Sequence, residues 1–183
     1  LEGLLSIIDD DGNWTAYDIL PQRSSVAWDP SIEVEMIAET TNIVQGETTT
    51  VGTRLDPADH WHTFWRMGGD SGEPTSASEW VAPDGTVIGD IQWPAPHWLP
   101  FYDTDLVNFG YEAEVLLPIE ITLPADFEGD TVELSTLAFW NVCDQICIPA
   151  EQRLSVTLPV AEVAELDAGN QQAFADARAE LPE

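Results

Sequence analysis

Two cysteines, Cys143 and Cys147, are the residues of this 183-residue chain that are best suited to chemistry. They are the only cysteines in the sequence, and they lie four positions apart. A fully extended chain would separate their Cα atoms by about 13 Å, whereas disulfide-bonded cysteines have Cα atoms roughly 4.4–6.8 Å apart. If the two thiols meet, the backbone must therefore turn between them. Three kinds of site are open at this point: a reversible dithiol, an inert disulfide and a metal site.

The residues around the pair favour a dithiol that needs an activated partner. Asp144 directly follows Cys143, and no Lys, Arg or His lies within five residues of the pair on either side. The thiolate is the species that attacks a disulfide, and a neighbouring carboxylate disfavours it. We therefore expect a reversible dithiol that exchanges electrons with a better-activated protein, rather than a free-standing strong oxidant.

A metal site would need ligands from distant parts of the chain. The remaining histidines and methionines that would have to converge on the cysteines are His60, His62, His97, Met36 and Met67. A blue-copper site takes His, Cys and a weak axial ligand, and here no His follows Cys143. His60 and His62 flank Trp61 and would share one face of a strand, where they could bind a metal or simply be half exposed. We predict no metal and no cofactor.

Other catalytic motifs are missing from the sequence. The glycine-rich segment 67–74 is not followed by Lys-Ser/Thr or by a helical pattern, so it predicts a tight connection with positive φ angles rather than a phosphate cradle. No Ser-His-Asp set or distinct carboxylate pair emerges among the 34 acidic residues. The sequence therefore gives no support for a hydrolase.

Strand patterns on both sides of the cysteines predict a hairpin with the pair at its tip. Residues 131–140 read as the incoming strand, residues 153–158 as the outgoing one, and Asp144-Gln145 as turn material. Pro149 is expected to end the local pairing because proline cannot donate a ladder hydrogen bond.

The rest of the chain predicts an all-β fold. Alternation and turn residues indicate strands at 32–38, 42–55 with a turn at 45–47, 61–66, 78–82, 86–93 and 111–123, the last broken at Pro118. Pro83-Asp84-Gly85 predicts a hairpin turn, and the proline- and aromatic-rich segment 94–102 predicts a surface loop. An alanine-rich helix is expected at 167–181. Seven to nine short strands and one late helix favour an immunoglobulin-like antiparallel β-sandwich.

Composition restricts the partners. Five basic against 34 acidic residues give a net charge of −29, which excludes nucleic acid and anionic membrane as ligands. No apolar run approaches the ~20 residues of a membrane span and no leader pattern is visible, so we expect a soluble piece, natural or trimmed from a longer protein. Two close cysteines suit a periplasmic or secreted protein and equally a cytosolic redox pair.

Four segments, in order, resemble the N-terminal periplasmic domain of the DsbD/ScsB thiol:disulfide interchange proteins, and the ScsB-like branch more closely. They are His62–Gly72, Ile91–Pro96, Gly110–Pro118 and Val142–Pro149, within a similarity over about residues 30–160. The resemblance implies an immunoglobulin-like periplasmic domain of an inner-membrane protein, acting as the electron-relay part of a protein-disulfide reductase. Its partners would be a thioredoxin-fold periplasmic isomerase or reductase, and the membrane and thioredoxin-like domains of the same protein.

The resemblance also implies roles for single residues. Cys147 would form the mixed disulfide with the partner and Cys143 would resolve it. A cap loop at about 97–110 would shield the disulfide, with Phe101, Tyr102 and Phe109 as candidates. This chain departs from the family in its short Cys-x3-Cys spacing and in its cap sequence. The ScsB-like branch is associated with copper tolerance.

These observations predict three regions: an N-terminal extension at 1–30 that packs on the body, a redox domain at 31–160, and a helix with the start of a linker at 161–183. The alternative function is a non-enzymatic secreted β-sandwich that binds a ligand, has a structural disulfide, and in one version handles copper through its histidines.

Overall fold

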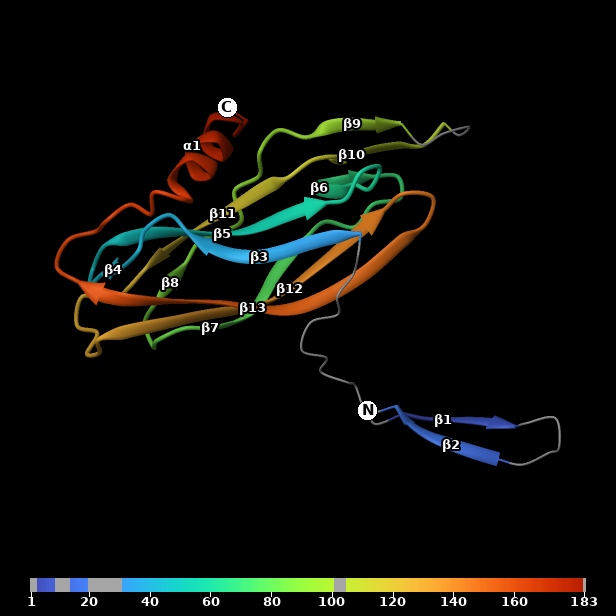
Figure 1. Ribbon diagram of the computed structural model, residues 1–183, viewed down its shortest axis with the longest axis horizontal. Coiled ribbons are helices and arrows are strands. Elements are labelled where there is room, and N and C mark those ends of the chain that lie inside the picture. The colour runs from blue at the N-terminus through green and yellow to red at the C-terminus, as the bar shows by residue number, and fades with distance from the viewer. Residues whose placement is uncertain (1–2, 9–13, 20–30, 101–104, 183) are drawn as a thin grey trace.

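The computed structural model describes residues 3–8, 14–19, 31–100 and 105–182 (Figure 1). Its described residues are mostly in strands, with one short helix near the C-terminus. Two four-stranded sheets lie face to face and bury the core between them. This arrangement is the predicted immunoglobulin-like β-sandwich.

The first sheet has the order β3-β5-β11-β8 and is antiparallel throughout. Its strands are β3 (Ile32–Ala38), β5 (Thr48–Pro57), β11 (Val115–Thr122) and β8 (Val87–Ile88). The predicted break at Pro118 is wrong, because β11 continues through this residue opposite Gly52. Pro118 is tolerated because its carbonyl accepts a hydrogen bond from the Gln92 N–H at 2.8 Å, and no neighbour requires an N–H from it.

The second sheet has the order β4-β13-β12-β7 and contains the hairpin that bears the cysteines. Its strands are β4 (Ile43–Val44), β13 (Cys147–Ala161), β12 (Thr131–Cys143) and β7 (Ser76–Val81), of which β4 runs parallel to β13 and the others pair antiparallel. Alternate side chains of β12 are buried, as a strand with one core-facing side requires: Val132, Leu134, Thr136, Ala138, Trp140 and Val142.

Pairing in this hairpin extends further than the sequence predicted. Every residue of β12 from Thr131 to Cys143 has a partner in β13, and Pro149 pairs with Asn141. The prediction that Pro149 ends the pairing is therefore wrong, because both strands continue two residues beyond it to the cysteines. The tip is thus built at the end of two long, continuously paired strands.

The turn at Pro83-Asp84-Gly85 is present, but it does not join a hairpin. The Thr86 N–H donates to the Pro83 carbonyl at 3.1 Å, and Gly85 has a φ of 81°. The flanking strands β7 and β8 pair with β12 and β11, which belong to different sheets. Turn residues fix local dihedrals, whereas the packing of the two sheets decides which strands pair.

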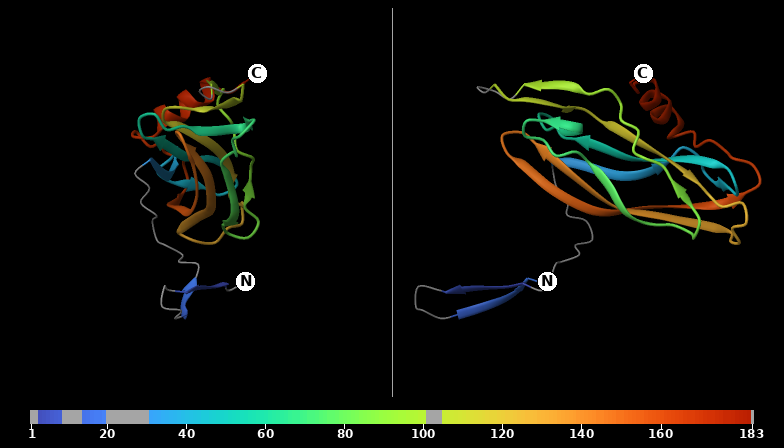
Figure 2. Two further views of the ribbon diagram at one scale, coloured as in Figure 1. Left: turned by 90° about the vertical axis from the view of Figure 1, so that its right-hand side faces the viewer. Right: turned by 180° about the vertical axis from the view of Figure 1, so that it is seen from behind.

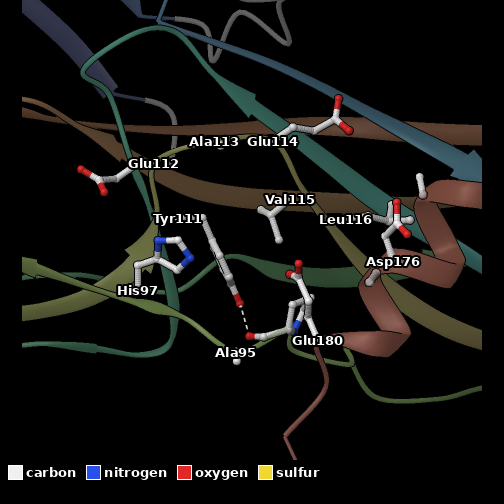
Figure 3. A pocket seen from close by; sticks show the side chains of 13 residues that line it. Ala95, His97, Tyr111, Glu112, Ala113, Glu114, Val115, Leu116, Asp176 and Glu180 are labelled. Carbon is white, nitrogen blue, oxygen red and sulfur yellow. Dashed lines mark hydrogen bonds between the residues drawn. The ribbon is translucent and has the colours of Figure 1, made fainter.

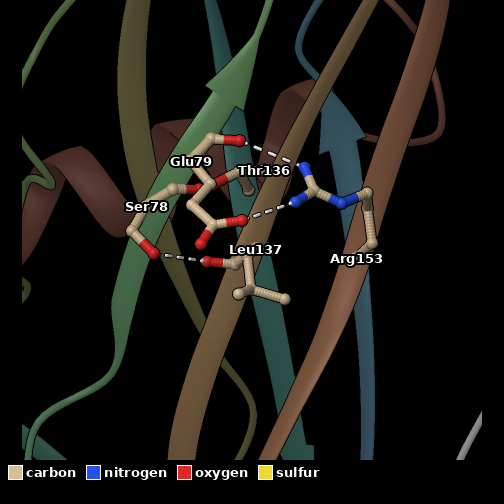
Figure 4. A network of polar contacts seen from close by, with 5 residues as sticks. All are labelled: Ser78, Glu79, Thr136, Leu137 and Arg153. Atoms are coloured by element: carbon tan, nitrogen blue, oxygen red, sulfur yellow. Dashed lines mark hydrogen bonds and ion pairs between the residues drawn. The ribbon is translucent and has the colours of Figure 1, made fainter. Parts of the chain in front are cut away.

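A polar network attaches the edge strand β7 to the second sheet (Figure 4). Arg153 on β13 reaches across β12, and donates to the Glu79 carbonyl at 3.1 Å and to its carboxylate at 3.0 Å. Glu79 has a φ of 47°, and the pairing of β7 with β12 shifts register beside it. The Thr136 hydroxyl donates to the Ser78 carbonyl at 2.6 Å. These bonds satisfy the backbone at the irregularity.

A small third sheet lies at the end of the sandwich toward the cysteine hairpin (Figure 1). It has the order β6-β10-β9, with β6 (Thr63–Gly69), β10 (Val107–Tyr111) and β9 (His97–Pro100). The prediction of an irregular loop at 94–102 is wrong for 97–100, which pair with residues 107–110. β9 is an edge strand of this sheet and pairs only with β10 among the described strands, and prolines are tolerated at the ends of edge strands.

The helix α1 (Gln171–Ala179) covers the outer face of the first sheet (Figure 2). Its buried residues Phe174 and Ala177 pack on Ile37 and Leu116, whose neighbours in β3 and β11 point into the core instead. The predicted helix is therefore confirmed, with a shorter span. Leu166 precedes the helix and is exposed.

The N-terminal strands β1 (Gly3–Ile8) and β2 (Trp14–Ile19) pair antiparallel with each other. That the extension at 1–30 packs on the body stays a prediction.

Candidate redox site at the hairpin tip

Cys143 and Cys147 form a disulfide at the tip of the β12–β13 hairpin. The S–S distance is 2.02 Å and the Cα atoms are 4.1 Å apart. The two residues pair directly across the strands, and the Asp144 N–H donates to the Ile146 carbonyl at 3.1 Å to close the tip. Residues at such a non-hydrogen-bonded position have the closest side chains in an antiparallel pair. The predicted turn between the cysteines is confirmed.

The two cysteine residues differ in their exposure to solvent. Cys143 is 0% exposed, whereas Cys147 is an exposed residue. Ile146, which directly precedes Cys147, is 68% exposed and gives the tip an apolar surface. A large molecule that approaches this disulfide therefore meets Cys147 first. The roles of the two thiols are still predictions. The difference in burial is consistent with them, because the exposed Cys147 is the one predicted to form the mixed disulfide and the buried Cys143 is the one predicted to resolve it.

A histidine far away in the sequence lies beside Cys143. The backbones of His62 and Cys143 exchange two hydrogen bonds, each 2.9 Å from nitrogen to oxygen. Residues paired in this way carry their side chains on the same face of the sheet. The His62 ring also meets the Phe64 ring edge to face, with centroids 5.2 Å apart. The local sequence around the cysteines has no basic residue, and the fold provides this imidazole instead.

The charge state of His62 follows from its surroundings. Burial lowers the pKa of the imidazole below its ordinary value of 6.5, and the nearby carboxylates of Glu112 and Asp144 only partly offset this. Desolvation disfavours the charged form. At neutral pH the ring is therefore uncharged and can accept a proton.

The predicted neighbourhood of His60 and His62 on one strand face is wrong. His60 lies in a turn with a φ of 74°, and β6 begins only at Thr63. His97 lies in β9, on the other side of β10. Within the described ranges, no group of three or more His, Cys, Asp or Glu residues lies close enough to hold a metal ion.

The predicted cap residues are only partly described. Phe101 and Tyr102 lie outside the described residues. Phe109 lies in β10, pairs with Trp98 in β9, and is 37% exposed. Because β10 pairs with β6, and His62 just before β6 pairs with Cys143, the β9–β10 hairpin is placed at the same end as the disulfide. Shielding of the disulfide by any of the three aromatics stays a prediction.

The glycine-rich segment after Met67 fastens β10 to β6. The Asp70 carboxylate accepts from the Val107 N–H at 2.8 Å, and the Asn108 side chain accepts from the Ser71 N–H at 3.1 Å. Gly69 has a φ of 92°, which confirms the predicted tight connection with positive φ. A Cβ at Gly72 would overlap the Phe64 ring. Glycines are needed here so that this loop can close on the strand that leads to His62.

A cavity whose lining includes neither cysteine lies between α1 and β11 (Figure 3). It measures about 470 Å³ and is lined by acidic and apolar side chains, among them Glu112, Glu180 and Val115. The Tyr111 hydroxyl donates to the Pro94 carbonyl at 2.8 Å, and burial raises the pKa of this phenol. Tyr111 therefore stays protonated and anchors the segment before β9.

Comparisons with known proteins agree with this geometry. Residues 33–159 match the family described as thiol:disulfide interchange protein DsbD, N-terminal. The N-terminal periplasmic domain of ScsB from Proteus mirabilis is similar in structure, with a TM-score of 0.60 and 20% identity over 87% of this chain. The chain spans 57% of the length of that structure.

A further structural similarity is weaker. A family 123 glycoside hydrolase from Clostridium perfringens gives a TM-score of 0.39 at 8% identity, over 73% of this chain and 28% of its own. No curated protein sequence matches. Among the described residues, no helix is both long and apolar enough to cross a membrane.

Proposed function

Because this chain belongs to the family of the N-terminal domain of thiol:disulfide interchange protein DsbD, we propose that it is a periplasmic disulfide-reductase domain that carries electrons through Cys143 and Cys147. Electrons would reach the disulfide from a membrane-embedded redox domain and a thioredoxin-like domain of the same protein. The reduced dithiol would then pass them to a thioredoxin-fold isomerase or reductase in the periplasm.

The observation that carries this proposal is the unequal burial of a disulfide placed at a hairpin tip. Cys147 is exposed and Cys143 is fully buried. Thiol–disulfide exchange proceeds through a mixed disulfide between an accessible sulfur and the partner, which a second thiol then resolves. We assign the mixed disulfide to Cys147 and the resolving step to Cys143, in agreement with the family's order of the two thiols.

The surroundings of the pair support dependence on the partner. The carboxylates of Asp144 and Glu112 act on the His62 imidazole beside Cys143, and no Lys, Arg or His lies within five residues of the pair in the sequence. Without a nearby cation the thiolate gains little stabilisation, so exchange is driven by a partner thiol or disulfide that is itself activated.

Single cysteine variants test the assignment. We expect Cys143→Ser to accumulate a mixed disulfide with a thioredoxin-fold disulfide isomerase, because the resolving thiol is missing. Cys147→Ser should form none, because the remaining thiol is buried. Non-reducing electrophoresis after acid quenching measures both, and the double variant is the control for non-specific adducts. If Cys147→Ser traps the partner as well as Cys143→Ser does, the assignment of roles is wrong.

A further inference from the structure

His62 and Cys143 are held opposite each other by the backbone, independently of any side-chain contact. Their two reciprocal hydrogen bonds, both 2.9 Å, define a hydrogen-bonded antiparallel pair. Directly opposite residues of this kind have Cβ atoms about 4.5–5.5 Å apart on one face of the sheet. A thiol on one residue is within reach of an imidazole on the other.

The imidazole has an unused hydrogen-bonding atom. Nε2 of His62 is buried and has no hydrogen-bond partner among the described residues. Buried polar atoms are normally paired, so a persistent exception points to a function or to a partner present in another state. The neighbouring sulfur of Cys143 is oxidised here and carries no proton. Reduction of the disulfide would give this position an S–H donor.

We propose that His62 accepts the proton of the Cys143 thiol when that thiol resolves the mixed disulfide. This inference rests on the proposed function, because it concerns the second step of the same exchange. Cys143 needs such help because it is fully buried and has no cation beside it in the sequence, and burial in apolar surroundings disfavours the thiolate.

The step balances as follows. In the mixed disulfide, Cys147 is bonded to a sulfur of the partner protein and Cys143 is a thiol. The Cys143 proton moves to Nε2 of His62, and the thiolate attacks the Cys147 sulfur. The Cys143–Cys147 bond forms, the Cys147–partner bond breaks, and the partner sulfur leaves as a thiolate. The His62 imidazolium then gives up its proton, which the partner thiolate takes up directly or through solvent, and His62 is neutral again. Over both steps the domain loses two electrons and two protons, and the partner disulfide gains them.

The groups around His62 favour an imidazole that is neutral before the proton transfer and positively charged only while it holds the Cys143 proton. Burial keeps the imidazole neutral, while Glu112, which follows β10, and Asp144, at the hairpin tip, favour the imidazolium once the proton arrives. The Phe64 ring, packed edge to face at 5.2 Å, fixes the plane of the imidazole. The start of β6, the end of β10 and the hairpin tip therefore contribute to one proton-transfer position.

The two steps can be timed separately with dithio-bis-nitrobenzoate, an aromatic disulfide whose released thiolate is coloured. The reduced domain releases one coloured thiolate when Cys147 attacks and a second when Cys143 resolves. We expect His62→Gln to slow the second release about tenfold at neutral pH and to leave the first within about twofold. Because hydroxide ionises thiols unaided at higher pH, the difference should disappear as the pH rises to about 9.

Two controls separate a chemical role from a structural one. His60→Gln removes a nearby histidine that does not pair with Cys143, and it should behave like the parent. In the unaltered domain, the nitrogen NMR signal of His62 Nε2 should shift between the disulfide and dithiol forms, as a new S–H donor requires. This second measurement needs no variant and so does not depend on whether His62→Gln folds.

The outcomes are distinct. Equal second-release rates in His62→Gln and the parent at every pH, or an unchanged Nε2 signal on reduction, overturn the role of His62 and leave the proposed function standing. A parent domain that releases no second thiolate overturns both, since no resolving step then exists.

Discussion

Cys143 and Cys147 are bonded to each other, yet their surroundings differ. Cys143 is buried and paired through its backbone with His62, whereas Cys147 is exposed beside Ile146. A symmetric, fully buried disulfide would be protected from any partner. At this tip a partner can reach Cys147, while Cys143 stays buried next to it. Sequential exchange requires such an arrangement, because one sulfur bonds to the partner and the second then displaces it.

His62 should also make the stability of the domain depend on pH. Its pKa is lowered by burial from 6.5, so below about pH 6.5 the unfolded chain binds more protons than the folded one. The free energy of unfolding therefore contains a His62 contribution that is present above pH 6.5 and is lost as the pH falls below this value.

The comparison of the oxidised parent with His62→Gln isolates this effect. We expect the stability difference, parent minus variant, to decrease on going from about pH 7.5 to about pH 5.5, because glutamine does not titrate in this range. Urea denaturation at the two pH values measures it, and the titrating carboxylates are common to both proteins. A difference that stays constant or increases on acidification would contradict the burial of a neutral imidazole.

At the scale of residues, the sequence predicted the turn between the cysteines but missed the histidine beside Cys143. The turn between Cys143 and Cys147 followed from a four-residue spacing that only a reversed chain can close. The contact between His62 and Cys143 joins positions far apart in the sequence, and no local pattern reports it. The nearest signal was that His62 opens one of the four segments that carry the family resemblance.

Among the secondary-structure elements, the long β12–β13 hairpin of the second sheet positions the cysteines, and α1 covers the outer face of the first sheet. Phe174 on α1 is 0% exposed and packs on Ile37 and Leu116. Replacing a buried phenylalanine by alanine removes its apolar transfer energy and leaves a cavity. The helix therefore contributes to stability through very few side chains.

We expect Phe174→Ala to lower the free energy of unfolding by roughly 3–5 kcal/mol. Val163, which is 71% exposed in the segment before the helix, provides the matched control. Val163→Ala should change stability by no more than about 0.5 kcal/mol, as is usual for surface positions. Urea denaturation of the oxidised forms gives both values. A loss below about 1 kcal/mol for Phe174→Ala would show that the helix is not part of the cooperative unit.

Most elements could be located from the sequence, whereas several of their partners could not. The strands predicted at 32–38 and 131–140, of which the second extends to Cys143, and the helix near the C-terminus follow from periodicity. The Pro83-Asp84-Gly85 turn was found but leads from one sheet to the other, since its residues fix dihedrals and say nothing about pairing. The strand β9 was missed because its flanking prolines resemble a loop.

The chain carries a net charge of −29, and the arginines that the structure describes have partners. Arg54 pairs with Glu35, Arg153 with Glu79 and Arg178 with Glu39, while the Arg66 guanidinium lies 4.7 Å from the centre of the Trp65 ring. Exposed ion pairs contribute little to stability, so their main effect is to leave a uniformly acidic surface. A partner that docks near Cys147 is expected to present a neutral or basic face.

The redox midpoint of the Cys143–Cys147 couple tests the central claim most directly. The domain is equilibrated in dithiothreitol and glutathione buffers of known potential, quenched with acid, and its free thiols are counted. Exchange-active pairs have midpoints above about −300 mV, whereas structural disulfides lie below it. We predict a reversible two-electron transition above about −300 mV. A disulfide that stays fully oxidised at potentials well below this value would be structural, and would contradict the account.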